Sequence, residues 1–245
     1  MNSERVRDEV MQATLRESRM VIERLCQSIG VEDGILRSVT DCGVYSAALG
    51  LSGFAGLERQ LELLKNVSVE KVSASDEEDP ILFDAAGQHA WVVAEPALDL
   101  AVVAYRLRGQ SSVCISNVTE PTELAVLRAL AEKHGLKAEI EWKAGGGVAA
   151  RLSDRLAESP TTLDLLVYEG IPVSRELWFR LFHRSHDALA PDTVISRTHT
   201  GSIIVKPDGT IVGKEDPEFV DMDLSMLTRE HIVEPAFVRE KSERS

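Results

Sequence analysis

The chain has 245 residues, of which 44% are hydrophobic and 27% charged, a composition typical of a globular protein with a substantial core. Its 27 Lys and Arg residues stand against 40 Asp and Glu residues, which gives a net charge of −13. Binding to nucleic acid requires a concentrated basic face, and the sequence contains no basic cluster. The composition therefore excludes a nucleic-acid partner but allows a local basic pocket for a small anionic molecule.

The sequence also predicts where the protein resides. No apolar run approaches the roughly 18 residues of a membrane span, so no membrane partner is expected. Residues 1–9 carry charges of both signs and lack an apolar stretch, unlike a secretory signal. The three cysteines, Cys26, Cys42 and Cys114, lack the spacing of a disulfide framework or zinc knot and are expected to be reduced. Together these features predict a cytoplasmic protein.

The first predicted element is a long amphipathic helix over residues 3–29, which Ser3 begins and Gly30 ends in a left-handed conformation. Two interpretations of its apolar face stay open. The face packs on its own domain, or it forms a short coiled-coil seam in a homo-oligomer. The spacing of three and four residues that carries both interpretations runs through Met11, Leu15, Ser18, Ile22, Leu25 and Ile29.

Two more helices are predicted, over residues 32–49 and from Ser52 to Leu64. Between them, residues 47–56 are rich in Gly, Ala and Ser, which favours close helix packing over a ligand contact. Cys42 is expected to be part of the core. The acidic, polar stretch from Val67 to Pro80 indicates a linker.

After the linker, short β-branched and aromatic runs predict strands, interspersed with helices. Strands are expected at residues 81–83, 91–94, 100–105, 112–116, 137–142 and 163–168, and helices at 122–134 and 175–188. If residues 112–142 form a parallel strand–helix–strand unit, its crossover is right-handed. Lys206-Pro207-Asp208-Gly209 separates residues 202–205 from residues 210–212, which predicts a β-hairpin.

These elements predict an α+β or α/β fold. A helical N-terminal region, residues 1–66, precedes a mixed α/β domain of covering helices and a mixed sheet, residues 80–213. Residues 214–245 are expected to form an acidic C-terminal tail.

The densest gathering of reactive groups lies in residues 178–213. His183 and His186 are three residues apart on a predicted helix and could face one point, with Asp187 and His199 completing a metal shell. His183, His186 and His199 are therefore the candidate catalytic residues, as bases or metal ligands. The competing interpretation is electrostatic, because histidine is also favoured at the C-terminal end of a helix. The sequence does not name a cofactor or a metal.

The stretch after this helix is a candidate ligand-binding loop. Ser196, Arg197 and Gly201 precede a predicted strand, and such a loop can hold a carboxylate or phosphate through a guanidinium, a hydroxyl and backbone N–H groups. The alternative is a surface loop in which Arg197 pairs with acidic neighbours. Serine chemistry is less favoured, because the sequence lacks a G-x-S-x-G nucleophile elbow.

Two weaker candidates are also more readily explained as structure. Lys143 to Val148 contains three glycines that could cradle an anion, but it matches neither dinucleotide nor P-loop spacing and is interpreted as a turn. His89, between two predicted strands, is interpreted as a hydrogen-bonded turn residue.

Three stretches resemble an uncharacterised bacterial family catalogued as a domain of unknown function: a helical start followed by Gly30 and Gly34, a Gly-x-x-Gly-Leu step at residues 53–57, and a Pro-x-x-x-x-Ser-Arg motif at residues 191–197 followed by Gly201. The family's alternating glycines and alanines after the Ser-Arg pair are replaced here by residues 198–202, Thr-His-Thr-Gly-Ser. The resemblance lends no reaction and implies only that Ser196, Arg197 and Gly201 belong to a candidate site.

The sequence leaves two functions open. The first is a cytoplasmic enzyme acting on an anionic, carboxylate-type metabolite, as a metal-assisted hydrolase or lyase, in which Arg197 anchors the substrate. The second is a non-catalytic subunit that oligomerises or binds a partner through residues 3–29. A homo-oligomer is expected in either case.

Overall fold

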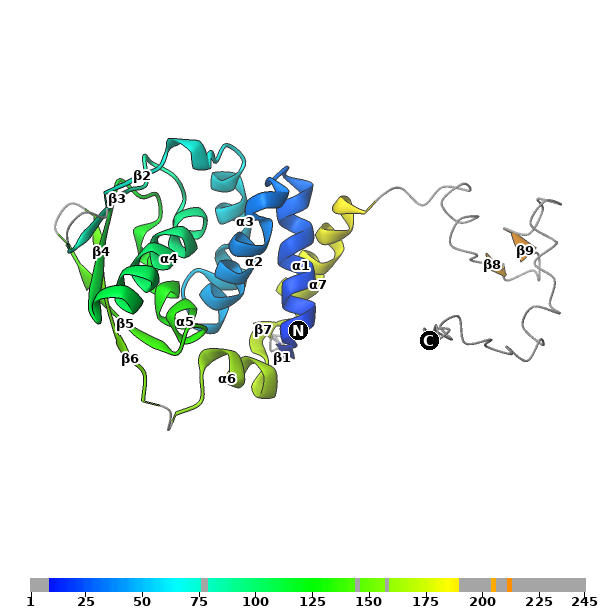
Figure 1. The fold of residues 1–245 in the computed structure, drawn as a ribbon. Coiled ribbons are helices and arrows are strands. Elements are labelled where there is room, and N and C mark those ends of the chain that lie inside the picture. Colours follow the sequence, from blue (N-terminus) through cyan, green and yellow to red (C-terminus); the bar gives the residue numbers. More distant parts are fainter. Residues whose placement is uncertain are drawn as a thin grey trace, which may run out of the picture. The chain divides into compact units, whose positions relative to one another are not determined.

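The computed structural model describes residues 9–75, 79–143, 146–156, 159–189, 204–205 and 211–212, and the chain divides after Leu189 into two compact units. The described part of the first unit contains seven α-helices, a mixed five-stranded sheet and a two-stranded sheet, which confirms the α+β class (Figure 1). In the second unit, β8 (Ile204–Val205) and β9 (Ile211–Val212) pair antiparallel, as the predicted hairpin requires.

The first predicted helix is shorter than expected. Residues 10–13 form a strand, β1 (Val10–Ala13), and α1 (Leu15–Ser28) begins after it. The helix starts at residue 15 because Thr14 and Glu17 form a capping box, in which each side chain accepts a bond from the other's backbone N–H. Gly30 follows the helix with φ of +83°, the left-handed conformation expected at this end.

The apolar face of α1 is used within the unit itself. Ser18, Ile22 and Leu25 are no more than 1% exposed, and α1 packs against α2 (Asp33–Ala48). The interpretation that the helix packs on its own domain is therefore confirmed for the centre of the predicted face, while Leu15 and Ile29 at its ends are partly buried.

Helix α2 lies between α1, α3 (Gly53–Leu64) and α4 (Ala90–Arg108) and is buried over most of its length. The close packing predicted from small residues is confirmed, because a Cβ added to Gly53 would lie 2.9 Å from the Cα of Ala47. Buried Asp41 joins Arg19 at 3.1 Å and Lys133 at 3.2 Å, so one carboxylate connects α1, α2 and the end of α5 (Leu127–Glu132). The helical N-terminal region and the sheet thus share one core. Whether the predicted regions behave as separate domains stays a prediction.

The five-stranded sheet has the order β2-β3-β4-β6-β5. Only β3 and β4 are parallel neighbours; the other pairs are antiparallel. Helices α4 and α5 cover one face, and no described element covers the other (Figure 1). The strands are β2 (Ser73–Ser75), β3 (Ile81–Asp84), β4 (Ser111–Ser116), β5 (Leu136–Trp142) and β6 (Val148–Asp154).

Three predicted strands are wrong, and two of them fall within one helix. Residues 91–94 and 100–105 belong to the single helix α4, which is the crossover between parallel β3 and β4. The crossover expected within residues 112–142 is not formed by neighbouring strands, because β6, which the sequence did not reveal, lies between β4 and β5. The helix expected at 122–134 begins as a 3-10 turn, Pro121–Val126, and continues as α5 (Leu127–Glu132).

Residues 163–168, also predicted as a strand, lie in α6 (Thr162–Glu169), which begins with a second capping box between Thr161 and Asp164. The strand comes directly afterwards as β7 (Ile171–Ser174), which pairs antiparallel with β1. Gly170 joins the two elements with φ of +73°, and a Cβ there would lie 2.8 Å from the Ala13 carbonyl oxygen. Glycine is therefore required at this step. Among the described residues, no helix has the length and apolar character needed to span a membrane.

Candidate functional site

The structure places two of the three candidate histidines. Helix α7 (Arg175–Ser185) begins at Ser174, whose hydroxyl accepts a hydrogen bond from the Leu177 N–H as predicted. His183 and His186 are both exposed at the end of this helix, with ring centroids 6.1 Å apart. The ring of Phe182 lies 4.9 Å from that of His186. His183 and His186 are thus close together, as their spacing of three residues predicts, and both lie on the surface of the protein.

His199, Ser196, Arg197 and Gly201 lie outside the described residues, so their convergence with His183 and His186 stays a prediction. Among the residues that are described, no three His, Cys, Asp or Glu side chains come together as metal ligands.

A feature missed from the sequence occurs at the carboxyl ends of the parallel strands β3 and β4. The loops that leave these strands contain all three described non-glycine residues with positive φ: Ala86 at +49°, Asn117 at +51° and Glu120 at +60°. Such conformations cost roughly 1–3 kcal/mol each and persist only where surrounding contacts impose them. Asp84 supplies one such contact, because its Oδ1 accepts from the Ala86 N–H at 2.8 Å and from Asn117 Nδ2 at 3.0 Å. These bonds lower the pKa of Asp84.

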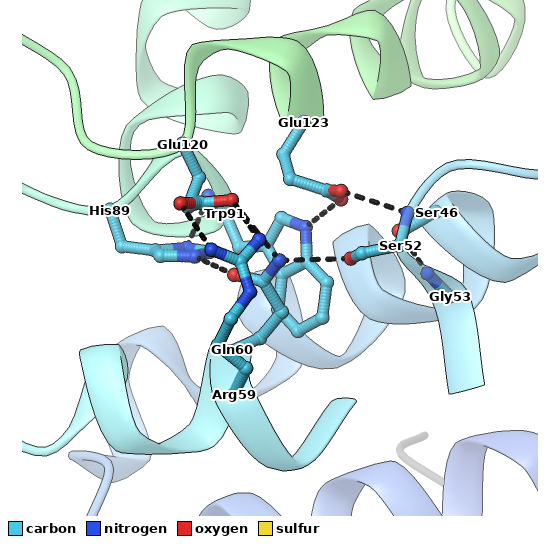
Figure 2. A network of polar contacts seen from close by, with 9 residues as sticks. All are labelled: Ser46, Ser52, Gly53, Arg59, Gln60, His89, Trp91, Glu120 and Glu123. Carbon is cyan, nitrogen blue, oxygen red and sulfur yellow. Dashed lines mark hydrogen bonds and ion pairs between the residues drawn. The ribbon is translucent and has the colours of Figure 1, made fainter. Parts of the chain in front are cut away.

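His89 lies beneath these loops in a buried polar network that links α3, α4 and the β4–α5 connection (Figure 2). Its Nδ1 accepts a hydrogen bond from the Trp91 N–H at 3.1 Å, which caps the N-terminus of α4. Nδ1 is therefore unprotonated in the neutral ring, and Nε2 donates to Gln60 Oε1 at 2.7 Å. Burial lowers the pKa of His89 to about 4. With both nitrogens bonded and 1% of its surface exposed, His89 is a structural residue, as predicted.

Two glutamates complete the network (Figure 2). Glu123, 2% exposed, accepts from Trp91 Nε1 at 2.8 Å and from the Ser52 N–H at 3.0 Å. Glu120 forms a two-pronged ion pair with Arg59, whose Nη1 lies 2.8 Å from Glu120 Oε1, and this pair lowers the pKa of Glu120. The donors and acceptors of the network are matched within the protein. We therefore interpret it as the support that holds the strained loops in place.

A broad hollow lies elsewhere, between α5, β5 and the segment that leaves β6. We call it the α5–β5 groove. It has a volume of about 780 Å³, against 370 to 430 Å³ for the three other hollows described here. Its lining combines apolar side chains, Ala138, Ile140, Leu156 and Pro160, with charged ones from several elements.

The charged side chains of the groove differ in whether they have hydrogen-bond partners within the protein. Its acidic side chains have partners: Glu132 accepts from the Thr162 N–H at 2.7 Å, Glu139 accepts from Lys137 at 2.7 Å, and Asp154 accepts from Tyr105 at 3.0 Å. Arg155 donates to the Ser159 carbonyl oxygen.

By contrast, Arg128, exposed on α5, has no ion pair or hydrogen bond with any described residue. The groove thus offers guanidinium donors to a ligand, because the acidic side chains near them already accept hydrogen bonds from other residues. No local sequence pattern reveals it, because its lining residues come from separate elements and meet only in the fold.

Neither a family model nor a curated protein matches this chain. Solved structures resemble it distantly. Malate dehydrogenase from Pyrococcus horikoshii OT3 has 18% identity and a TM-score of 0.47, over 62% of this chain and 49% of that chain.

Malate dehydrogenase from Entamoeba histolytica has 12% identity and a TM-score of 0.44, over 71% and 62% of the two chains. Sulfolactate dehydrogenase from Methanocaldococcus jannaschii has 13% identity and a TM-score of 0.44, over 83% and 60%. This chain thus spans between about half and three fifths of the lengths of these proteins. None of the three reaches a TM-score of 0.5, and the activities in their names remain properties of those proteins.

Proposed function

We propose that this protein binds a small anionic metabolite of the carboxylate class in the α5–β5 groove. One observation carries the proposal. Arg128 is exposed and has no described partner, while the acidic side chains that line the same groove already accept hydrogen bonds from other residues. An arginine presents a planar fork of donors that matches a carboxylate, so Arg128 and Arg155 would hold the charged end of the ligand. Ala138, Leu156 and Pro160 would contact its apolar body.

The expected size of the effect follows from the charge-assisted bonds. A hydrogen bond to a charged group contributes about 1.5–3 kcal/mol, so Arg128→Ala should weaken carboxylate binding by roughly 10- to 100-fold. A ligand present at about a hundred times its dissociation constant adds roughly 2.7 kcal/mol of stability to the wild type. A thermal-shift screen with mono- and dicarboxylates, followed by calorimetric titration of any hit, measures both quantities.

Arg106→Ala is the matched control, because Arg106 is an exposed arginine on α4 that does not line the groove. We expect this variant to bind as the wild type does. A ligand that binds Arg128→Ala and Arg106→Ala equally well would locate the binding site elsewhere and refute the groove. The absence of any shift across the carboxylates would refute the proposed ligand class.

A second candidate function is a metal-assisted hydrolase or lyase at the end of α7. It is favoured by the two exposed imidazoles of His183, in the last turn of α7, and His186, directly after it, whose ring centroids are 6.1 Å apart. Helix α7 packs mainly against α1, α3, β1 and β7, not against the elements that line the groove, so this surface is separate. Imidazole pairs of this kind bind zinc and other transition metals when further ligands are supplied.

Removal of one imidazole distinguishes this candidate. If the pair binds metal, His183→Ala and His186→Ala should each weaken Zn²⁺ binding at least about tenfold in a calorimetric titration, since each removes a ligand. His134→Ala is the control, because His134 lies at the end of α5 near Asp99. Equal zinc affinity in all three variants and the wild type would leave the two histidines without a role in metal binding.

A further inference from the structure

One face of the five-stranded sheet has no described covering element, and its centre is apolar. The registers Leu82↔Cys114 and Cys114↔Ala149 place these three side chains in one row on that face. Leu82 is 58% exposed, although the alternate side chains of the same strand, Ile81 and Phe83, are buried under the helices. The same row ends in polar side chains, Ser75 on β2 and Glu141 on β5, so its apolar part lies at the centre of the face. A sheet face that is meant for water carries polar side chains along the whole of such a row. This row, which we call the open-face row, therefore indicates contact with another surface.

The open face has both a projection and depressions. Two hollows of about 390 and 370 Å³ lie on it, and Cys114 lines both. The second hollow is bordered by Leu82 and by the small side chains Ser73, Ser75 and Ser116. Because the protruding leucine and the hollows occur on the same face, a second copy related by a two-fold axis can place its Leu82 in a hollow of the first. Symmetric dimers use one self-complementary patch in this manner.

The charge of the open face also favours a second copy. The whole chain carries a net charge of −13, so two copies repel each other over most of their surface. The charged side chains on and beside the open face are instead close to balance, three basic and four acidic: Lys137, Lys143, Arg151, Asp79, Asp84, Glu139 and Glu141. Two of the opposite charges are paired within the chain, Lys137 with Glu139 at 2.7 Å and Lys143 with Glu141 at 2.8 Å. Two copies therefore meet at this face with little net repulsion, whereas a strongly basic or strongly acidic partner gains little from it.

We propose that the open face is the interface of a homodimer, in which the sheets of two copies pack face to face around the open-face row. Face-to-face sheet packing with interdigitated side chains is a common arrangement. The small residues beside Leu82 let the two sheets approach closely. This inference does not rest on the ligand proposed for the α5–β5 groove, although Lys137 and Glu139 border both the groove and the open face.

The test compares two leucine-to-arginine variants of the full chain by light scattering over a range of concentrations. Leu82→Arg places a charge in the centre of the interface, where charges are disfavoured, and should raise the dimer dissociation constant at least about tenfold. Leu107→Arg makes the same change on the exposed surface of α4, where Leu107 is 80% exposed, and should leave the dimer intact. Circular dichroism melts of both variants check that they are folded.

Maleimide labelling of Cys114 provides a second readout without a mutation. Cys26 and Cys42 are buried, and their thiol pKa values are raised, so Cys114 is the thiol expected to react. Its labelling rate should fall as concentration rises and dimer replaces monomer, in the wild type and in Leu107→Arg but not in Leu82→Arg.

Three results would overturn the proposal. One is a wild type that stays monomeric at every concentration. This result would count against the proposal even if Cys114 of that monomer reacted slowly with maleimide because another part of the chain covers it. The second is a dimer that persists unchanged in Leu82→Arg. The third is a dimer in which Cys114 reacts as fast as it does in the monomer.

Discussion

Glu123→Ala should lower the free energy of unfolding by about 2–4 kcal/mol. The substitution leaves the indole N–H of Trp91, a residue with no exposed surface, without an acceptor, and it also removes the acceptor of the Ser52 N–H. An unsatisfied buried donor costs about 1–3 kcal/mol, and the vacated side-chain volume adds to the loss. Urea unfolding followed by circular dichroism measures the change. Glu139→Ala, which removes a carboxylate that is 60% exposed, should change the free energy by no more than about 0.5 kcal/mol.

A double-mutant cycle separates the Trp91 bond from the other effects of Glu123→Ala. Trp91→Phe removes the indole N–H, so in that background Glu123→Ala no longer leaves this donor unpaired. The loss caused by Glu123→Ala should therefore be smaller by about 1–2 kcal/mol in Trp91→Phe than in the wild type. Strictly additive effects would show that the Trp91–Glu123 bond contributes nothing to stability and that the network is not the support we infer.

Local signals in the sequence locate several elements well. Gly30 after α1, Ser174 before α7 and the helix starting near Ser52 are each recognisable from one or two residues. Helix α4 shows where such reasoning fails. Its residues 91–94 are apolar without a gap, because α2 and the sheet bury the helix on opposite sides, and a continuous apolar run has no period that distinguishes helix from strand. The end signals, His89 as N-cap and Gly109 with φ of +73°, are the information that favours a helix.

The polar network could not be predicted for a different reason. His89 meets Gln60 across 29 residues of chain, and Glu123 meets Ser52 across 71. Neither partner is visible in a local pattern, since the contacts depend on how α3, α4 and the β4–α5 connection pack. The same holds for Arg128 and the lining of the α5–β5 groove. The clustering of histidines and arginines near the end of the sequence, by contrast, is a local feature, and it drew attention to a window that the structure describes only as far as Leu189 and in the β8–β9 pair.

The second large effect should appear as a pH dependence of stability that originates at His89. Burial lowers the pKa of this histidine to about 4, from 6.5 for an unperturbed side chain, against the opposing effect of Glu123 and Glu120 and with a smaller contribution from Arg59. Between these pKa values the unfolded chain binds a proton that the folded protein does not. The stabilisation is therefore complete above pH 6.5 and is lost as the pH falls toward 4. The total loss is about 3 kcal/mol, since one pKa unit corresponds to about 1.4 kcal/mol.

His89→Asn is the variant that isolates this contribution. An asparagine oxygen can still accept the Trp91 N–H at the start of α4, so the cap is retained while the titrating group is removed. Carboxylates titrate mainly at lower pH and in both proteins, so we compare the two free energies of unfolding between about pH 7 and pH 5. Over this range the wild type should lose about 2 kcal/mol more than the variant. Parallel pH profiles would mean that His89 is protonated as readily in the folded protein as in the unfolded chain, which its burial and its two hydrogen bonds do not permit.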